Sequence, residues 1–153
     1  MATVLIVEDD LVMADLLKDI VTGAGYEVCG IASSFSEAVA LGLHFQPELA
    51  IIDMRLDGPG LGTDVAFELS AFSRIGVLYT TGDPSNVLAN AVHGDACLTK
   101  PYRPDDLLRS LTIVHEIAAS GDVLQPFPPG FRLVHPGTVP RRPVVGMTPS
   151  SSE

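Results

Sequence analysis

The sequence predicts an α/β fold in which helices cover a parallel sheet of five strands. Along the first 120 residues, five short apolar runs alternate with five segments whose apolar residues recur at helical spacing. Strands separated in this way by helices pair in parallel, because each helix carries the chain back across the sheet. The chain has 153 residues, of which 46% are hydrophobic and 18% are charged, so it can bury one substantial core.

The first half of the pattern contains three strands and two helices. Apolar residues at helical spacing within Met13–Val21 predict a helix, which Gly23 ends. Ser34 and Glu37 have the spacing of a capping box, so a second helix begins there and runs to about residue 45, before Pro47. The short apolar runs that predict strands in this half are Thr3–Val7, Tyr26–Ile31 and Leu49–Ile52.

The second half begins with a glycine-rich turn, Asp57–Gly62, and ends with a long helix. Pro104 suits the first turn of that helix, where Asp105 and Asp106 also favour the helix dipole. An apolar stripe from Leu107 to Ala118 predicts that the helix packs on the core. The other predicted elements of this half are a helix at Asp64–Phe72, a strand at Val77–Thr80, a short helix at Ser85–Val92 and a strand at Ala96–Thr99.

Residues 121–153 differ in composition and hold seven of the twelve prolines. They contain no helical pattern and no DNA-binding or catalytic motif, so we expect one domain at 1–120 and an extended tail with no effector domain. Composition alone predicts a disordered tail, but apolar residues such as Phe127, Phe131 and Val134 offer anchors. We therefore expect the tail to pack along its own domain or along a second copy in a homodimer.

Charge and cysteine content exclude several classes of function. Residues 1–120 carry six basic and seventeen acidic side chains, a net charge of −11, which disfavours nucleic-acid binding and favours a cation or a basic protein surface. No apolar stretch is long enough to span a membrane, and the N-terminus lacks the features of a signal peptide. With only two cysteines, the chain is expected in the reducing cytoplasm.

Reactive side chains follow four of the five predicted strands. Glu8–Asp10 follow the first strand, Asp53 the third, Thr81 the fourth and Lys100 the fifth. Ligands of open α/β sheets bind beyond the carboxyl ends of the strands, so we expect these groups to form one site. Clustered carboxylates repel one another unless a cation lies between them, and oxygen ligands favour Mg²⁺. A carboxylate can also accept a phosphoryl group, whose charge Mg²⁺ and a lysine would stabilise.

Four segments, VLIVEDD, AIIDMRL, VLYTTG and LTKPY, occur in this order and resemble the receiver domains of two-component response regulators. The resemblance covers residues 3–119. It implies a flavodoxin-like, doubly wound sheet of strand order 2-1-3-4-5. It also implies a single-domain regulator phosphorylated by a histidine kinase or a phosphotransfer protein, which signals by protein contact or by phosphorelay. Such a protein is not an enzyme, because it catalyses only its own phosphorylation and dephosphorylation.

The resemblance also implies residue roles. Asp53 resembles the phospho-acceptor, and Glu8 and Asp9 resemble the acidic pair that holds Mg²⁺ with it. Arg55 would contribute its backbone carbonyl to the metal. Asp10, in contrast, is expected to cap the following helix.

On the other side of the expected site, Thr81 resembles the hydroxyl residue that contacts the phosphoryl group, and Gly82 the small residue after it. Lys100 resembles the lysine that pairs with phosphate, and Pro101 its companion at a cis peptide bond. Cys97 departs from the family, because an aromatic switch residue usually occupies that position. With Cys29 and Cys97 expected on opposite edge strands, we predict that both are free thiols.

Two other functions remain open on the sequence. One is a pseudo-receiver, an adaptor that is never phosphorylated. The other is an aspartyl-phosphate phosphatase of the haloacid-dehalogenase type, which is disfavoured because Arg55 stands where that family needs a second aspartate, two residues after the nucleophile. A flavodoxin-like flavin carrier is weaker still, since the chain has acids after its first strand and no tryptophan.

Overall fold

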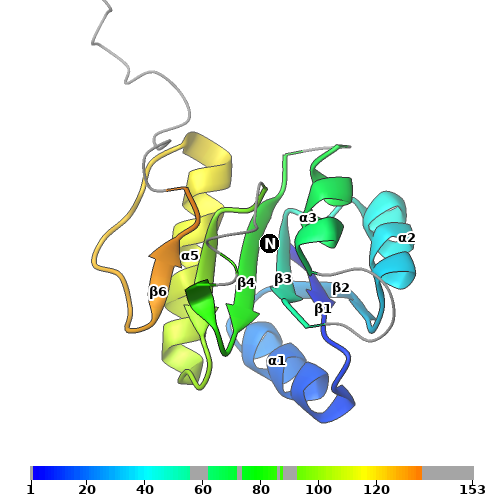
Figure 1. The fold of residues 1–153 in the computed structure, drawn as a ribbon, viewed down its shortest axis with the longest axis horizontal. Coiled ribbons are helices and arrows are strands. Elements are labelled where there is room, and N and C mark those ends of the chain that lie inside the picture. The colour runs from blue at the N-terminus through cyan, green and yellow to red at the C-terminus, as the bar shows by residue number, and fades with distance from the viewer. Residues whose placement is uncertain (1, 56–61, 72–73, 86, 88–92, 136–153) are drawn as a thin grey trace, which may run out of the picture.

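The fold alternates strands and helices in the predicted order (Figure 1). A computed structural model describes residues 2–55, 62–71, 74–85, 87 and 93–135. In these ranges the elements are β1 (Thr3–Val7), α1 (Leu11–Gly23), β2 (Glu27–Ala32), α2 (Phe35–Phe45), β3 (Leu49–Asp53), α3 (Gly62–Ser70), β4 (Gly76–Thr81), β5 (Ala96–Thr99), α5 (Pro104–Ser120) and β6 (Phe131–Leu133).

The strands form one sheet of order β2-β1-β3-β4-β5-β6. The first five are mutually parallel, which confirms the predicted order 2-1-3-4-5, and β6 is antiparallel to β5. Helices α1 and α5 pack on one face of the sheet, and α2 and α3 pack on the other. This arrangement is the doubly wound, flavodoxin-like fold that the family resemblance implies.

Alternation along the strands divides the core into two layers. In β1, Leu5 and Val7 join the layer under α2 and α3, whereas Val4 and Ile6 join the layer under α1 and α5. All four are buried, as is all of β3. Strands covered on both faces read as continuous apolar runs, and this is why these two were recognisable in the sequence.

Two predicted helix caps are present. Asp10 Oδ1 accepts hydrogen bonds from the backbone N–H groups of Val12, at 3.0 Å, and Met13, at 3.2 Å. Ser34 Oγ accepts from the N–H of Glu37 at 3.3 Å, and the Glu37 carboxylate accepts from the N–H of Ser33 at 2.8 Å. The bonds from Val12, Met13 and Glu37 satisfy N–H groups that the first turns of α1 and α2 leave without partners in the helix, and the bond from Ser33 joins the residue before the cap to α2.

Several predicted boundaries shift by one or two residues. Helix α3 covers Gly62–Ser70 rather than Asp64–Phe72, because the chain enters the helix beside the end of β3. A Cβ at Gly62 would lie 2.6 Å from the carbonyl oxygen of Asp53, so only glycine fits there. The predicted helix at Ser85–Val92 and most of the predicted turn at Asp57–Gly62 lie outside the described residues.

The proline-rich segment after α5 returns to the sheet and adds a sixth strand that the sequence analysis did not predict. Phe131 and Val134 are 6% and 4% exposed, and the ring of Phe131 lies against that of Phe127, with centroids 4.8 Å apart. Residues 121–135 therefore pack along their own domain. One expectation is corrected by this strand: Cys97 in β5 does not lie on an edge, since β6 covers it. Cys29 and Cys97 are both free, as predicted.

Truncation after Ser120 should lower the melting temperature, because it exposes the apolar surface that Phe131 and Val134 cover and leaves β5 as an open edge. Thermal melting followed by circular dichroism measures the loss, and light scattering shows whether the open edge causes association. The variant Phe127→Ala is the matched control and should cost less, since Phe127 is already 37% exposed. An unchanged melting temperature after truncation would contradict a stabilising role for this segment.

Candidate functional site

Three carboxylates meet where the neighbouring strands β1 and β3 end. In the pairing of these strands, Val7 lies opposite Ile52, so Glu8 and Asp53 leave the sheet side by side. Ligand oxygens of Glu8, Asp9 and Asp53 all lie within 4.8 Å of one another. Glu8 is only 2% exposed and Asp53 only 6%, so water screens their repulsion poorly.

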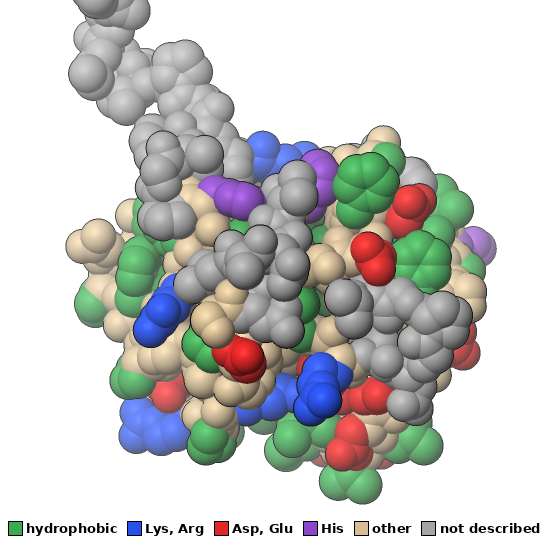
Figure 2. All heavy atoms as spheres, viewed as in Figure 1, with side chains coloured by type: hydrophobic (Ala, Val, Ile, Leu, Met, Phe, Trp, Pro, Cys, Tyr) green, Lys and Arg blue, Asp and Glu red, His purple; other side chains and the backbone are tan. Residues whose placement is uncertain are grey.

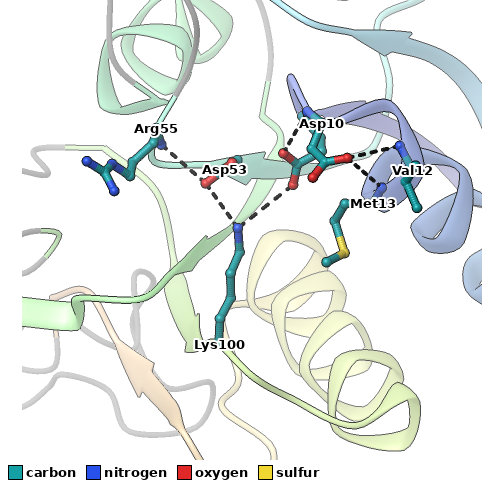
Figure 3. Close-up of polar contacts among 7 residues, drawn as sticks. Asp10, Val12, Met13, Asp53, Arg55 and Lys100 are labelled. Carbon is teal, nitrogen blue, oxygen red and sulfur yellow. Dashed lines mark hydrogen bonds and ion pairs between the residues drawn. The ribbon is translucent and has the colours of Figure 1, made fainter.

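The ammonium group of Lys100 lies between two of these carboxylates (Figure 3). Its Nζ atom is 3.4 Å from Asp53 Oδ1 and 3.9 Å from Glu8 Oε1. The backbone N–H of Lys100 donates to the carbonyl of Thr81 at 2.8 Å, which ties the end of β5 to the end of β4. The peptide bond between Lys100 and Pro101 is cis, as expected from the family resemblance. Figure 2 shows acidic and basic side chains next to one another on the lower part of the face in view.

The local field makes Glu8 a weak acid. Burial is the largest cause, followed by the close approach and negative charge of the Asp53 carboxylate, and together they raise the pKa of Glu8 from 4.5 to about 8. The N–H of Asp10, which donates to Glu8 Oε2 at 3.2 Å, and the charge of Lys100 act in the opposite direction. One lysine does not compensate three clustered carboxylates. A hard divalent cation with oxygen ligands fits this donor set.

Asp53 lies at the centre of the contacts. Its Oδ1 atom faces Lys100 and also accepts a hydrogen bond from the backbone N–H of Arg55 at 3.2 Å. The Arg55 residue itself is exposed. The structure thus places the Arg55 backbone beside Asp53, and the metal contact expected of its carbonyl stays a prediction.

Thr81 ends β4 on the side of the site that Lys100 approaches. Its hydroxyl accepts from the N–H of Asp83 at 3.0 Å and donates to the Asp83 carbonyl at 3.2 Å. The neighbouring Thr80 lies in the sheet, opposite Asp53 of β3 and Leu98 of β5. The predicted contact of Thr81 with a phosphoryl group stays a prediction.

Tyr102, like Tyr79, was considered from the sequence only as a possible substitute for the aromatic switch residue that Cys97 replaces. Its hydroxyl is buried and has no hydrogen-bond partner among the described residues. Burial, then the charges of Glu8 and Asp53, raises its pKa to about 12, so the hydroxyl lies within the field of the acidic cluster. Its position directly after the Lys100–Pro101 pair was the signal that could have found it.

Cys97 occupies the position at which the receiver family usually has an aromatic switch residue. The thiol is fully buried in the core layer that also contains Tyr79 and Val134. The Tyr79 hydroxyl donates to the carbonyl of His93 at 2.6 Å. An aromatic ring therefore lies in this core layer, but it comes from β4 rather than from the usual position in β5.

Comparison with known proteins agrees with the fold and the site. The response regulator receiver domain family matches residues 4–112. Chemotaxis protein CheY of Thermotoga maritima is 32% identical over 116 residues, covering 72% of this chain and 95% of that protein. A solved CheY-like receiver domain protein from Methanospirillum hungatei superposes with a TM-score of 0.70 at 26% identity, covering 80% of this chain and 99% of that one. The chain belongs to the response regulator receiver family.

Some other relatives are longer proteins, of which this chain matches only a part. Aerobic respiration control protein ArcA of Escherichia coli is 31% identical over 107 residues, which cover 68% of this chain but only 44% of ArcA. The match therefore spans less than half the length of that protein. Among the residues described, no helix has the length and apolar character needed to cross a bilayer.

The raised pKa of Glu8 predicts a pH dependence of stability in the ion-free protein. The folded state holds the proton of Glu8 more tightly than the unfolded state, so the free energy of unfolding should fall as the pH rises from 4.5 to about 8. Urea denaturation in the presence of a chelator measures this profile. In Glu8→Gln this part of the profile should be flatter, and the same slope in both proteins would assign the effect to another group.

Proposed function

We propose that this protein is a response regulator receiver that takes a phosphoryl group onto Asp53 from a histidine kinase or a phosphotransfer protein. The observation that carries the proposal is the approach of Lys100 Nζ to within 3.4 Å of Asp53 Oδ1, inside the cluster of three carboxylates. A buried carboxylate with a cation beside it is suited to act as a nucleophile toward phosphorus. The family to which the chain belongs supports the same role.

The residues present fit Mg²⁺. Glu8, Asp9 and Asp53 supply clustered carboxylate oxygens, and the buried Glu8 Oε1 has no hydrogen-bond partner among the residues that the structure describes. We propose that these three side chains and the backbone carbonyl of Arg55 hold the ion. When bound, Mg²⁺ neutralises negative charge on the acidic cluster and on the transferred phosphoryl group.

The protein's own residues carry out the transfer. A carboxylate oxygen of Asp53 forms a bond to phosphorus while the bond from phosphorus to the donor histidine nitrogen breaks, and the electron pair leaves with that nitrogen. Lys100 stays close enough to pair with a phosphoryl oxygen once Asp53 has reacted. Thr81 contributes its hydroxyl after rotation away from Asp83. Hydrolysis of the resulting acyl phosphate by water returns Asp53 to its carboxylate.

The proposed output is contact with a protein partner or passage of the phosphoryl group along a relay. In this proposal residues 1–120 are the receiver and residues 121–153 are the tail. A homodimer through the tail is a second mode of output, and the cytoplasm is the compartment in which we place the protein. Phosphorylation at Asp53 separates this function from that of a pseudo-receiver, which takes no phosphate.

Incubation with acetyl phosphate and Mg²⁺ should add one phosphoryl group to the wild-type protein and none to Asp53→Ala. Intact-mass analysis measures the adduct, which should be stable in acid and labile in base, as expected for an acyl phosphate. Lys100→Ala should fold and bind the donor but accept phosphate more slowly, because it lacks the cation beside Asp53. Equal labelling of wild type and Asp53→Ala would contradict the assignment.

Asp9 and Asp10 provide a matched pair of neighbouring acids with different proposed roles. Asp9→Ala should weaken Mg²⁺ binding, because it removes a carboxylate from the cluster. Asp10→Ala should leave Mg²⁺ affinity close to wild type and cost about 1 kcal/mol of stability, because it removes the cap of α1. Calorimetric titration with MgCl₂ and urea denaturation measure the two effects. The reversed pattern would shift the ligand assignment by one residue.

A further inference from the structure

The segment after α5 is hydrogen-bonded to the residue that precedes Lys100. This segment, residues 121–135, is called the strap below; it lies outside residues 4–112, which match the receiver family, and it ends in β6 at the sheet edge (Figure 1). The Gly130 carbonyl of the strap accepts from the backbone N–H of Thr99 at 3.0 Å and from the Thr99 hydroxyl at 3.2 Å. Thr99 is the last residue of β5, so the strap contacts the strand end from which Lys100 follows.

Contacts within the strap and with α5 hold the Gly130 carbonyl in place. The N–H of Phe131 donates to the carbonyl of Pro128 at 3.2 Å, which closes a turn in which Gly130 has a φ of +81°. That backbone conformation favours glycine. Phe131 is buried in the core layer under α1 and α5, and Arg109 of α5 donates to the carbonyl of Pro126 at 3.2 Å. The acceptor of Thr99 is therefore anchored on both sides along the strap.

The backbone at the end of β5 is held from two sides. On the side of β4, the N–H of Lys100 donates to the carbonyl of Thr81 at 2.8 Å, and on the other side Thr99 donates to Gly130. Pro101 follows and has no N–H to donate. Thr99 and Lys100 thus carry the last two consecutive backbone donors at this end of the strand.

The position of this backbone matters because the Lys100 side chain is long. Its Nζ atom lies 3.4 Å from Asp53 Oδ1, and the side chain is 30% exposed. A flexible four-carbon stem joins the ammonium group to the backbone, so few contacts besides its starting point determine where Nζ lies. Catalytic groups have to be held closely, since a displacement of about 1 Å can cost a factor of about 100 in rate.

We propose that Thr99 is a positioning residue for Lys100 and that the strap, through Gly130, thereby takes part in phosphoryl transfer to Asp53. The Gly130 carbonyl holds Thr99, and Thr99 holds the backbone from which the Lys100 ammonium reaches Asp53. Thr99 acts through Lys100 and touches neither the phosphoryl group nor the ion. This inference rests on the proposed function, because the place of Lys100 affects activity only if Asp53 accepts a phosphoryl group.

The test is the rate at which the full chain is phosphorylated by acetyl phosphate at a fixed MgCl₂ concentration, followed by intact mass. Thr99→Val keeps the shape of the side chain and the backbone hydrogen bond but removes the hydroxyl. Its rate should fall about five-fold, as expected for the loss of one hydrogen bond. Thr99→Ser retains the hydroxyl and should react at nearly the wild-type rate. A Thr99→Val rate equal to wild type, or an equal fall in Thr99→Ser, would overturn the proposal.

Thr112→Val is the matched control. Its hydroxyl also donates to a backbone carbonyl, that of Leu108 at 3.1 Å, but the bond lies within α5. This variant should be phosphorylated at the wild-type rate, and a similar fall in both valine variants would contradict a specific role of Thr99. Calorimetric titration with MgCl₂ should show that Thr99→Val binds the ion as tightly as wild type, because the clustered carboxylates follow β1 and end β3. Weaker binding would count against the proposal, since the damage would then extend beyond Lys100.

Combination with Lys100→Ala tests whether Thr99 acts through Lys100. Thr99→Val should slow phosphorylation of the wild type but cause no further loss in Lys100→Ala, because the group that it positions is already absent. A further five-fold loss in the double variant would show an effect independent of Lys100 and would refute the proposed role.

The inference and the proposed function fail in different ways. Wild-type protein that takes no phosphoryl group from acetyl phosphate would overturn the proposed function, and the role of Thr99 with it. Wild-type labelling that Thr99→Val matches in rate would overturn the role of Thr99 alone and leave the proposed function in place.

Discussion

The repulsion among three carboxylates at the ends of β1 and β3 is the constraint on which the site depends. Parallel pairing of these strands brings Glu8 and Asp53 together whatever their charges, because Val7 and Ile52 are in register inside the sheet. Because β1 and β3 are buried and fixed in the core, the carboxylates remain close together despite their mutual repulsion. Three features reduce the resulting repulsion: the ion pair of Lys100 with Asp53, the protonation of Glu8 that its raised pKa favours, and the proposed cation.

The added strand β6 pairs with β5, the strand that ends just before Lys100. Gly130 accepts from both the N–H and the hydroxyl of Thr99, at 3.0 and 3.2 Å, directly before Lys100 in the chain. Val134 donates its N–H to the carbonyl of Asp95 at 3.0 Å, at the other end of β5. The strand that delivers Lys100 is therefore paired on both sides, and Cys97 within it is fully buried.

Features that depend on a single local rule, such as helix capping or the apolar character of a buried strand, were predicted correctly from the sequence. Asp10 was identified as a cap because a short polar side chain before an apolar helical repeat has few other uses. The five parallel strands were visible as apolar runs. β6 was missed because its three residues lie among prolines and alone carry no pattern, and they form a strand only because β5 offers an unpaired edge. The hydroxyl of Tyr102 has no hydrogen-bond partner among the described residues, and a sequence cannot show this.

The sequence by itself determined the order of elements, the parallel sheet and the set of reactive residues at the strand ends, since apolar periodicity and chain order specify these. The doubly wound strand order was expected from the family resemblance and not from the periodicity. Tertiary structure alone decided the distances that matter, such as 3.4 Å from Lys100 to Asp53, and the environment that raises the pKa of Glu8. It also decided that the segment after α5 closes the sheet. The physical reason is that burial and contact between distant parts of a chain arise only once the strands are paired and the core is packed.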